Sequence, residues 1–215
     1  MQPEFAIRHL QFQAKITPMQ KIQFTTQSLP EGFFWFNEPL SYTCNAGLTL
    51  TTRAQTDFWQ RTHYGFRRDD GHCLLTSVTG DFTLESSVEF SPVSQYDQCG
   101  LMIRVDSENW IKCSIEFEDS EHSRLGSVVT NLGFSDWATQ DIPSWMQAMS
   151  YRISRRGSDF RIEHSTDGEH WNQMRIAHLH QCPPTLQIGV YACSPIGERF
   201  TCTFNYIGIG ESRWV

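Results

Sequence analysis

The sequence is poor in charge, in lysine and in long apolar runs, and each shortage excludes a class of protein. Acidic residues outnumber basic ones by 24 to 17, which gives the 215-residue chain a net charge of −7. Its only lysines are Lys15, Lys21 and Lys112. Nucleic-acid-binding domains normally carry a basic face, so we expect no nucleic-acid partner. No stretch approaches the roughly 20 apolar residues of a membrane-spanning helix, so we expect no membrane partner either.

The cysteines form no CxxC pair, and their number, seven, is odd. Several of them, such as Cys99 and Cys113, lie within apolar runs, where a free cysteine behaves as a small core residue. The first 15 residues show no apolar segment of the secretory type. We therefore expect reduced thiols and a cytoplasmic protein. His178, His180 and Cys182 alternate and would share a strand face, but zinc normally needs a fourth ligand, so we expect no metal and no other cofactor.

Short runs of alternating apolar and polar residues dominate the chain, and aromatic residues make up 13% of it. A period of two is typical of a β-strand with one buried face. The clearest runs have the apolar residues Phe82, Leu84, Val88 and Phe90; Ile111, Cys113, Ile115 and Phe117; Leu186, Ile188, Val190 and Ala192; and Phe200, Cys202, Phe204 and Tyr206. Turn-forming Gly, Asp and Asn residues separate such runs at intervals of about 10 to 15 residues. This spacing predicts an all-β protein with two antiparallel sheets packed as a sandwich.

The first 30 residues fit this pattern less well, because Phe5, Ile7, Leu10 and Phe12 alternate only loosely. We expect residues 1–30 to form an N-terminal arm or an added edge strand. Residues 31–215 contain no linker, repeat or low-complexity tract. Because sandwiches of about 200 residues commonly fold as one unit, we expect a single domain over residues 31–215.

Four stretches of the sequence together resemble one family. They are Asp57–Phe66, Tyr96–Arg104, Asn109–Lys112 running into Ile115–Phe117, and Ser165–Trp171. The chain is similar to the concanavalin-A-like family of unknown function that is named after a fungal protein regulating enolase. The resemblance covers roughly residues 33–209 and implies a jelly-roll sandwich of the lectin, glucanase and laminin-G-like type. It brings no known reaction, and it implies a metabolic enzyme as one kind of partner.

Polar and aromatic residues alternate on three predicted strands and are the candidates for a ligand site. They are Asp57, Trp59, Arg61 and His63 on one strand, Arg104 on a second, and Trp110, Lys112 and Glu116 on a third. The second and third strands are joined by a short turn, so they should be antiparallel neighbours with these side chains on one face. If the three strands line one sheet, they form a cleft with mixed charges and two indole rings. Sugar hydroxyls bind to such polar groups, and the C–H faces of a sugar stack on aromatic rings.

Each of these sets also has a purely structural interpretation. Charged residues on alternating strand positions are commonly a solvated face with cross-strand pairs. Asp57 and Arg61 can form an ion pair stacked on Trp59, and Trp110 can pack where its strand begins. Trp137 follows a turn-rich segment and is a candidate platform at the rim of the cleft.

Three functions from different classes remain open on the sequence. The first is a non-catalytic domain that binds a carbohydrate or a small polar ligand in the concave face of the sandwich. The second is a protein-interaction module that regulates a metabolic enzyme, with the aromatic run Phe33–Phe36 as its candidate surface. The third is a glycoside hydrolase, because Glu116 and Glu118 are two residues apart and hydrolysis of a glycosidic bond commonly uses two carboxyl groups.

Overall fold

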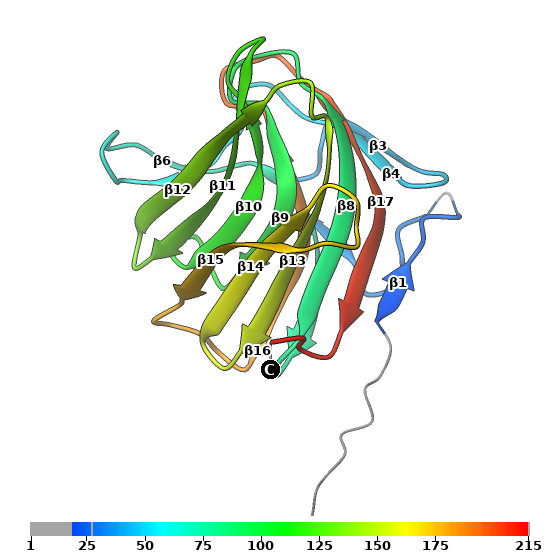
Figure 1. Cartoon of the computed structure of the whole chain (residues 1–215), viewed down its shortest axis with the longest axis vertical. Coiled ribbons are helices and arrows are strands. Elements are labelled where there is room, and N and C mark those ends of the chain that lie inside the picture. The colour runs from blue at the N-terminus through cyan, green and yellow to red at the C-terminus, as the bar shows by residue number, and fades with distance from the viewer. Residues whose placement is uncertain (1–18, 27, 215) are drawn as a thin grey trace, which may run out of the picture.

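Two antiparallel sheets hold most of the regular structure in the computed structural model, which describes residues 19–26 and 28–214. The eight-stranded sheet has the order β15 (Asn172–His178), β14 (Asp159–Ser165), β13 (Ala148–Arg156), β8 (Thr83–Ser91), β17 (Thr201–Gly210), β4 (Leu48–Thr51) and β3 (Ser41–Cys44), and β1 (Gln20–Ile22) also pairs with β17. The seven-stranded sheet has the order β12 (Phe134–Pro143), β11 (His122–Asn131), β10 (Trp110–Phe117), β9 (Gln98–Arg104), β16 (Thr185–Cys193), β7 (His72–Thr79) and β2 (Phe34–Phe36). The sheets face each other (Figure 1). The chain is thus an all-β jelly-roll sandwich, as the sequence predicts.

The main core lies between the two sheets and is built from the alternating residues of the sequence. Ile111, Cys113 and Ile115 of β10 are fully buried there, as is Leu84 of β8. Because strand side chains alternate, the intervening residues of β10 point to the opposite face of the seven-stranded sheet. That outward face carries the candidate site.

The last strand departs from simple alternation. The sequence pattern puts Tyr206 on the same face as Phe204, but the pairing of β17 with β8 shifts register between these two residues. The irregularity moves Ile207 into the core, and the Tyr206 hydroxyl instead donates a hydrogen bond to Glu85 (2.7 Å). One extra residue in a strand reverses the faces of all that follow it.

Strand β1 lies beside β17 (Figure 1). Lys21 Nζ of β1 is 4.1 Å from the centre of the Tyr206 ring. Residues 1–18, which make up most of the predicted arm or edge strand, lie outside the described residues. The division of the chain at residue 30 stays a prediction.

A small hairpin covers part of the outward face of the seven-stranded sheet. It consists of β5 (Phe58–Gln60) and β6 (Arg67–Asp69) and forms a sheet of its own. Between hairpin and sheet lies a second group of buried side chains, here called the hairpin cluster: Phe58, Trp59, Cys73, Leu75, Met102, Trp110, Val128, Tyr191 and Cys193. The strand predicted around residue 59 is therefore not part of either large sheet but a layer added on top of one.

Candidate functional site

Strand pairing places three polar side chains side by side on the outward face. In the register of β9 with β10, Glu116 is opposite Gln98 and Lys112 is opposite Met102. Ser114 separates Lys112 from Glu116 on the same strand face, which brings Gln98 between them. This antiparallel arrangement of β9 and β10 is the one that the short turn predicted.

The hairpin adds Asp57 to this group because Phe58 anchors it to the sheet. The Phe58 ring is fully buried, with ring centres 6.1 Å from both Trp110 and Tyr191. Gly71 makes the insertion possible, since a Cβ atom at that position would lie 2.3 Å from the Phe58 ring. At the other end of β5, the backbone N–H of Gln60 donates to Ser135 Oγ (2.9 Å), which ties the hairpin to β12.

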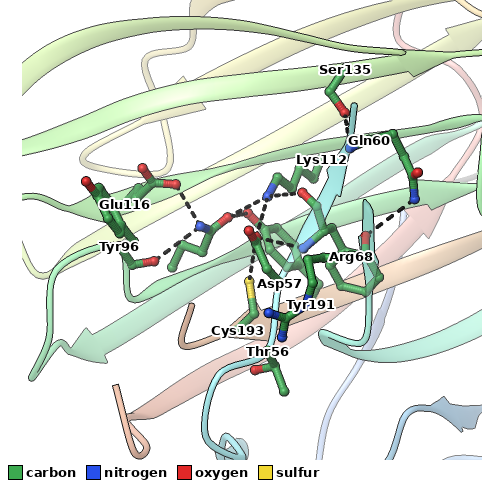
Figure 2. A network of polar contacts seen from close by, with 12 residues as sticks. Thr56, Asp57, Gln60, Arg68, Tyr96, Lys112, Glu116, Ser135, Tyr191 and Cys193 are labelled. Atoms are coloured by element: carbon green, nitrogen blue, oxygen red, sulfur yellow. Dashed lines mark hydrogen bonds and ion pairs between the residues drawn. The ribbon is translucent and has the colours of Figure 1, made fainter. Parts of the chain in front are cut away.

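Lys112 forms the junction between hairpin and sheet. Its ammonium donates to the carbonyl oxygen of Phe58 (2.9 Å) and to Gln98 Oε1 (2.8 Å), and it lies 3.7 Å from Asp57 Oδ1 (Figure 2). The side chain is almost completely buried. Two hydrogen bonds and the ion pair with Asp57 compensate the buried charge.

Gln98 continues this network toward Glu116 with all of its hydrogen-bonding capacity used. Its Oε1 accepts from Lys112 and from the Tyr191 hydroxyl (3.1 Å), and its Nε2 donates to Glu116 Oε2 (2.7 Å) and to the carbonyl oxygen of Tyr96 (3.2 Å). Burial raises the pKa of Tyr191 well above its usual range, so this hydroxyl stays a donor. Two donors on one side and two acceptors on the other fix the orientation of the amide.

Glu116 is the titratable group of the site. Burial raises the pKa of its carboxyl to about 7, which Lys112 opposes and the negative charge of Asp57 reinforces. Near neutral pH the carboxyl is therefore present in both its protonated and its ionised form. Its Oε2 accepts the bond from Gln98, and no hydrogen bond to Oε1 is formed within the described part of the chain.

These groups form one wall of a cleft of about 520 Å³, a volume within the usual range for small-molecule sites. The lining residues are Asp57, Trp59, Tyr64, Phe66, Arg68, Tyr96, Gln98, Lys112, Glu116, Val128, Trp137, Pro195 and Ile196. Several of them are large and exposed: Tyr64 is 56% exposed, and its ring stacks on that of Phe66 (centres 5.7 Å apart). Trp137, which pairs with Val128 across β11 and β12, is 37% exposed. Polar groups thus lie beside open aromatic surfaces.

Four of the eight predicted site residues line the cleft, and four do not. Asp57, Trp59, Lys112 and Glu116 line it. The Arg61 guanidinium donates to Glu108 Oε1 (3.0 Å) and lies over the Phe134 ring, and the exposed ring of His63 packs edge-on against Tyr64. The guanidinium of Arg104 forms two bonds to the Asp69 carboxylate (2.8 and 2.7 Å) and covers the Phe36 ring. Trp110 is fully buried in the hairpin cluster, where its indole donates to the Ser107 carbonyl oxygen (3.3 Å).

The polar sets do not all converge because β5 curls over the sheet instead of extending it. Asp57, at its start, points to Lys112, while Arg61 lies beyond its end, where the backbone takes a positive φ of 56°. Arg104 occupies the far end of β9 from Gln98, and its partner Asp69 comes from β6. Glu118 does not line the cleft either: it lies 3.7 Å from the Arg124 guanidinium and accepts from Gln95 Nε2 (3.0 Å).

The family assignment rests on most of the chain. A family model described as "Protein of unknown function (DUF1349)" matches residues 35–212. The chain belongs to this family. The resemblance seen in the four sequence stretches is thereby confirmed.

This DUF1349 member is similar to a yeast protein in sequence and to solved structures from yeast and bacteria in fold. A Saccharomyces cerevisiae protein named "Regulation of enolase protein 1" is 38% identical over 172 residues, which are 80% of this chain and 85% of that protein. A solved structure of a functionally unknown S. cerevisiae protein has a TM-score of 0.79 at 33% identity and covers 88% of this chain and 98% of its own. A GH43 protein from Bacillus licheniformis has a TM-score of 0.70 at 14% identity over 89% of this chain and 39% of its own, which shows the fold alone.

Several residues of the cleft carry no signal of their own in the sequence. Gln98, Tyr96, Tyr64 and Phe66 lie inside stretches that resemble the family, but only the pairing of β9 with β10 and the fold of the hairpin bring them to the cleft.

All seven cysteines are free. Among residues 19–26 and 28–214 no group of three or more His, Cys, Asp or Glu side chains is arranged to hold a metal ion. The same residues include no helix with the length and apolar character needed to span a bilayer.

Proposed function

We propose that this DUF1349 member is a non-catalytic binding domain whose cleft holds a carbohydrate or another small polar ligand. The observation that carries the proposal is the combination of a 520 Å³ cleft, exposed aromatic rings and a polar wall built from Asp57, Gln98 and Glu116. Aromatic rings bury the C–H faces of a sugar, and carboxyl oxygens accept hydrogen bonds from its hydroxyl groups. The network around Lys112 holds these groups in place before a ligand arrives, which lowers the entropic cost of binding.

The test is a thermal-shift screen of the purified protein against neutral and charged mono- and oligosaccharides and other small polar metabolites. A ligand at 100 times its Kd adds about 2.7 kcal/mol of stability, and for a chain of this size that raises Tm by about 5 to 11 °C. The shift should fall by about half or more in Trp137→Ala, which corresponds to an affinity loss of at least about 10-fold, and should be unchanged in Trp145→Ala. Trp145 is the matched control because it is 78% exposed and lies outside the cleft.

Trp137 is a better probe than Trp59 for this purpose. Trp59 is only 9% exposed and belongs to the hairpin cluster, and its indole donates to the Thr62 carbonyl oxygen (3.0 Å). Replacing it would loosen the hairpin as well as the ligand surface. A panel that gives no shift with any ligand would count against the binding proposal.

A second candidate function is a protein-interaction module that regulates a metabolic enzyme, and the name of the 38% identical yeast relative favours it. Less of the predicted surface Phe33–Phe36 is exposed than the sequence suggests. Trp35 packs on the main core with its ring 5.1 Å from that of Tyr42, and Phe36 packs on the hairpin cluster. Phe34, 39% exposed, is the outward member of β2. Loss of binding to purified enolase in Phe34→Ala would support this function, and absence of any binding by the unaltered protein would remove it.

A further inference from the structure

The cations that line the cleft are already held by carboxylates of the chain itself. Lys112 donates hydrogen bonds to the Phe58 carbonyl oxygen and to Gln98, and its charge is paired with Asp57. Arg68, the second lining cation, lies against Asp70 through Nε (3.0 Å to Oδ2) and Nη2 (2.9 Å to Oδ2), and Nη2 also donates to the Gln55 carbonyl oxygen. A carboxylate or phosphate in the cleft would have to compete with these internal partners.

The open hydrogen-bonding positions on the polar wall are acceptors. Asp57 uses Oδ1 for the Phe58 amide (2.7 Å) and for Lys112, and within the described residues no hydrogen bond reaches its Oδ2. Glu116 likewise uses Oε2 for Gln98 and leaves Oε1 open. Gln98 cannot turn its amide toward a ligand because all four of its hydrogen-bonding positions are occupied. The wall therefore offers carboxyl oxygens that attract hydroxyl donors and repel anions.

Charge leads to the same conclusion as the hydrogen bonds. Lys112 balances Asp57 and Arg68 balances Asp70, so the cleft carries no excess positive charge, and Glu116 adds a negative charge whenever it is ionised. An anion inside a partly desolvated cleft is costly unless a cation or several donors compensate it. Of the donors that remain, the Tyr64 hydroxyl is neutral, and Nη1 of Arg68 belongs to a guanidinium whose charge is already paired with Asp70.

We propose that the cleft selects neutral, hydroxyl-rich ligands, such as uncharged saccharides, and discriminates against their phosphorylated and carboxylated forms. The inference rests on the proposed binding function and narrows it. The hydroxyl groups of the ligand donate to Asp57 Oδ2 and Glu116 Oε1, while the sugar ring lies against Tyr64 and Trp137. A phosphate on the same sugar would be placed next to two carboxyl groups whose neighbouring cations are already paired.

The test compares matched pairs of ligands by isothermal titration calorimetry at pH 7.5: glucose with glucose 6-phosphate, mannose with mannose 6-phosphate, galactose with galacturonate, and neutral oligosaccharides with their oxidised, uronate-ended forms. The neutral member of a bound pair should bind at least 10-fold more tightly than the charged member. Equal or tighter binding of the charged member would overturn the charge selection and leave the binding function standing. Absence of binding by every compound would overturn both.

A designed variant tests the cause of the discrimination. Asp70→Asn removes the charge that balances Arg68 but keeps an oxygen that can accept the bond from the Asp57 backbone amide (2.8 Å). The variant should gain affinity for the anionic member of a pair by 5-fold or more and leave the neutral member within 2-fold. Asp136→Asn is the matched control, because Asp136 pairs with Arg175 (3.0 Å) and neither residue lines the cleft. An unchanged ratio in Asp70→Asn would show that the pairing of Arg68 does not set the selectivity.

Discussion

Replacement of Lys112 by methionine should be one of the most damaging single substitutions at this face. The change removes a buried ammonium, so the Phe58 carbonyl oxygen and Gln98 Oε1 each lose a hydrogen bond and the Asp57 carboxylate loses its cation. Breaking a buried charge pair by removing one partner typically costs about 3 to 5 kcal/mol. Asp57 keeps the Phe58 amide as a partner and has a side chain that is 15% exposed, so we expect the low end, about 3 kcal/mol.

Urea unfolding followed by tryptophan fluorescence measures this cost, and Lys21→Met provides the matched control. The Lys21 side chain is 50% exposed and its ammonium lies 4.0 Å from Glu85, so its loss should cost less than about 1 kcal/mol. Combining Lys112→Met with Asp57→Asn should recover about 1 to 2 kcal/mol, since the variant no longer buries an uncompensated charge. A cost below 1 kcal/mol for Lys112→Met, or strict additivity in the double variant, would refute the role given to this junction.

The pKa of Glu116 is raised from 4.5 to about 7, so the folded state binds the Glu116 proton more tightly than the unfolded state does. The contribution of protonated Glu116 to stability is therefore full below about pH 4.5 and is lost as pH rises through 7. The charged groups that act on Glu116 are Lys112, Asp57, Glu118 and Arg124. Between pH 5 and 8 the urea midpoint should fall less steeply in Glu116→Gln than in the unaltered protein. Parallel slopes would contradict this. Gly71→Ala should destabilise the protein by about 1 to 3 kcal/mol in urea unfolding, because the new methyl group overlaps the buried Phe58 ring, and a change below 0.5 kcal/mol would show that the ring can move aside. Trp137→Ala should lower ligand affinity at least 10-fold with less than about 1 kcal/mol change in stability, whereas unchanged affinity would remove the indole from the site.

The fold could be predicted from the sequence because alternation is a direct consequence of strand geometry. Residues such as Ile111 and Ile115 have to face one way and Lys112 and Glu116 the other once the segment is extended. The same logic placed Arg104 correctly beside the strand of Lys112. It failed at Tyr206, because a local irregularity in a strand leaves no trace in the apolar pattern.

The candidate site was only half accessible to such reasoning. The alternation of apolar and polar residues predicts that Lys112 and Glu116 share a strand face. It does not predict that the segment around Asp57 folds back over that face as a separate hairpin. That placement depends on the contact of Phe58 with Trp110 and Tyr191, and on the space left by Gly71, which are long-range features. Gln98 was missed for a related reason. Its role comes from four partners in three segments, namely Tyr96 in the preceding turn, Lys112 and Glu116 of β10, and Tyr191 of β16, and the apolar pattern does not show that they meet at one amide.

Binding of a neutral saccharide in the cleft can be followed at single residues by NMR of the tryptophan indole N–H groups. Uncharged oligosaccharides are titrated into the labelled protein, with the Trp137 and Trp145 signals assigned by substitution. We expect saturable shifts for Trp137 and none for Trp145. A spectrum in which Trp137 stays unchanged at millimolar concentrations of every neutral saccharide, or moves only with phosphorylated ligands, would contradict this expectation.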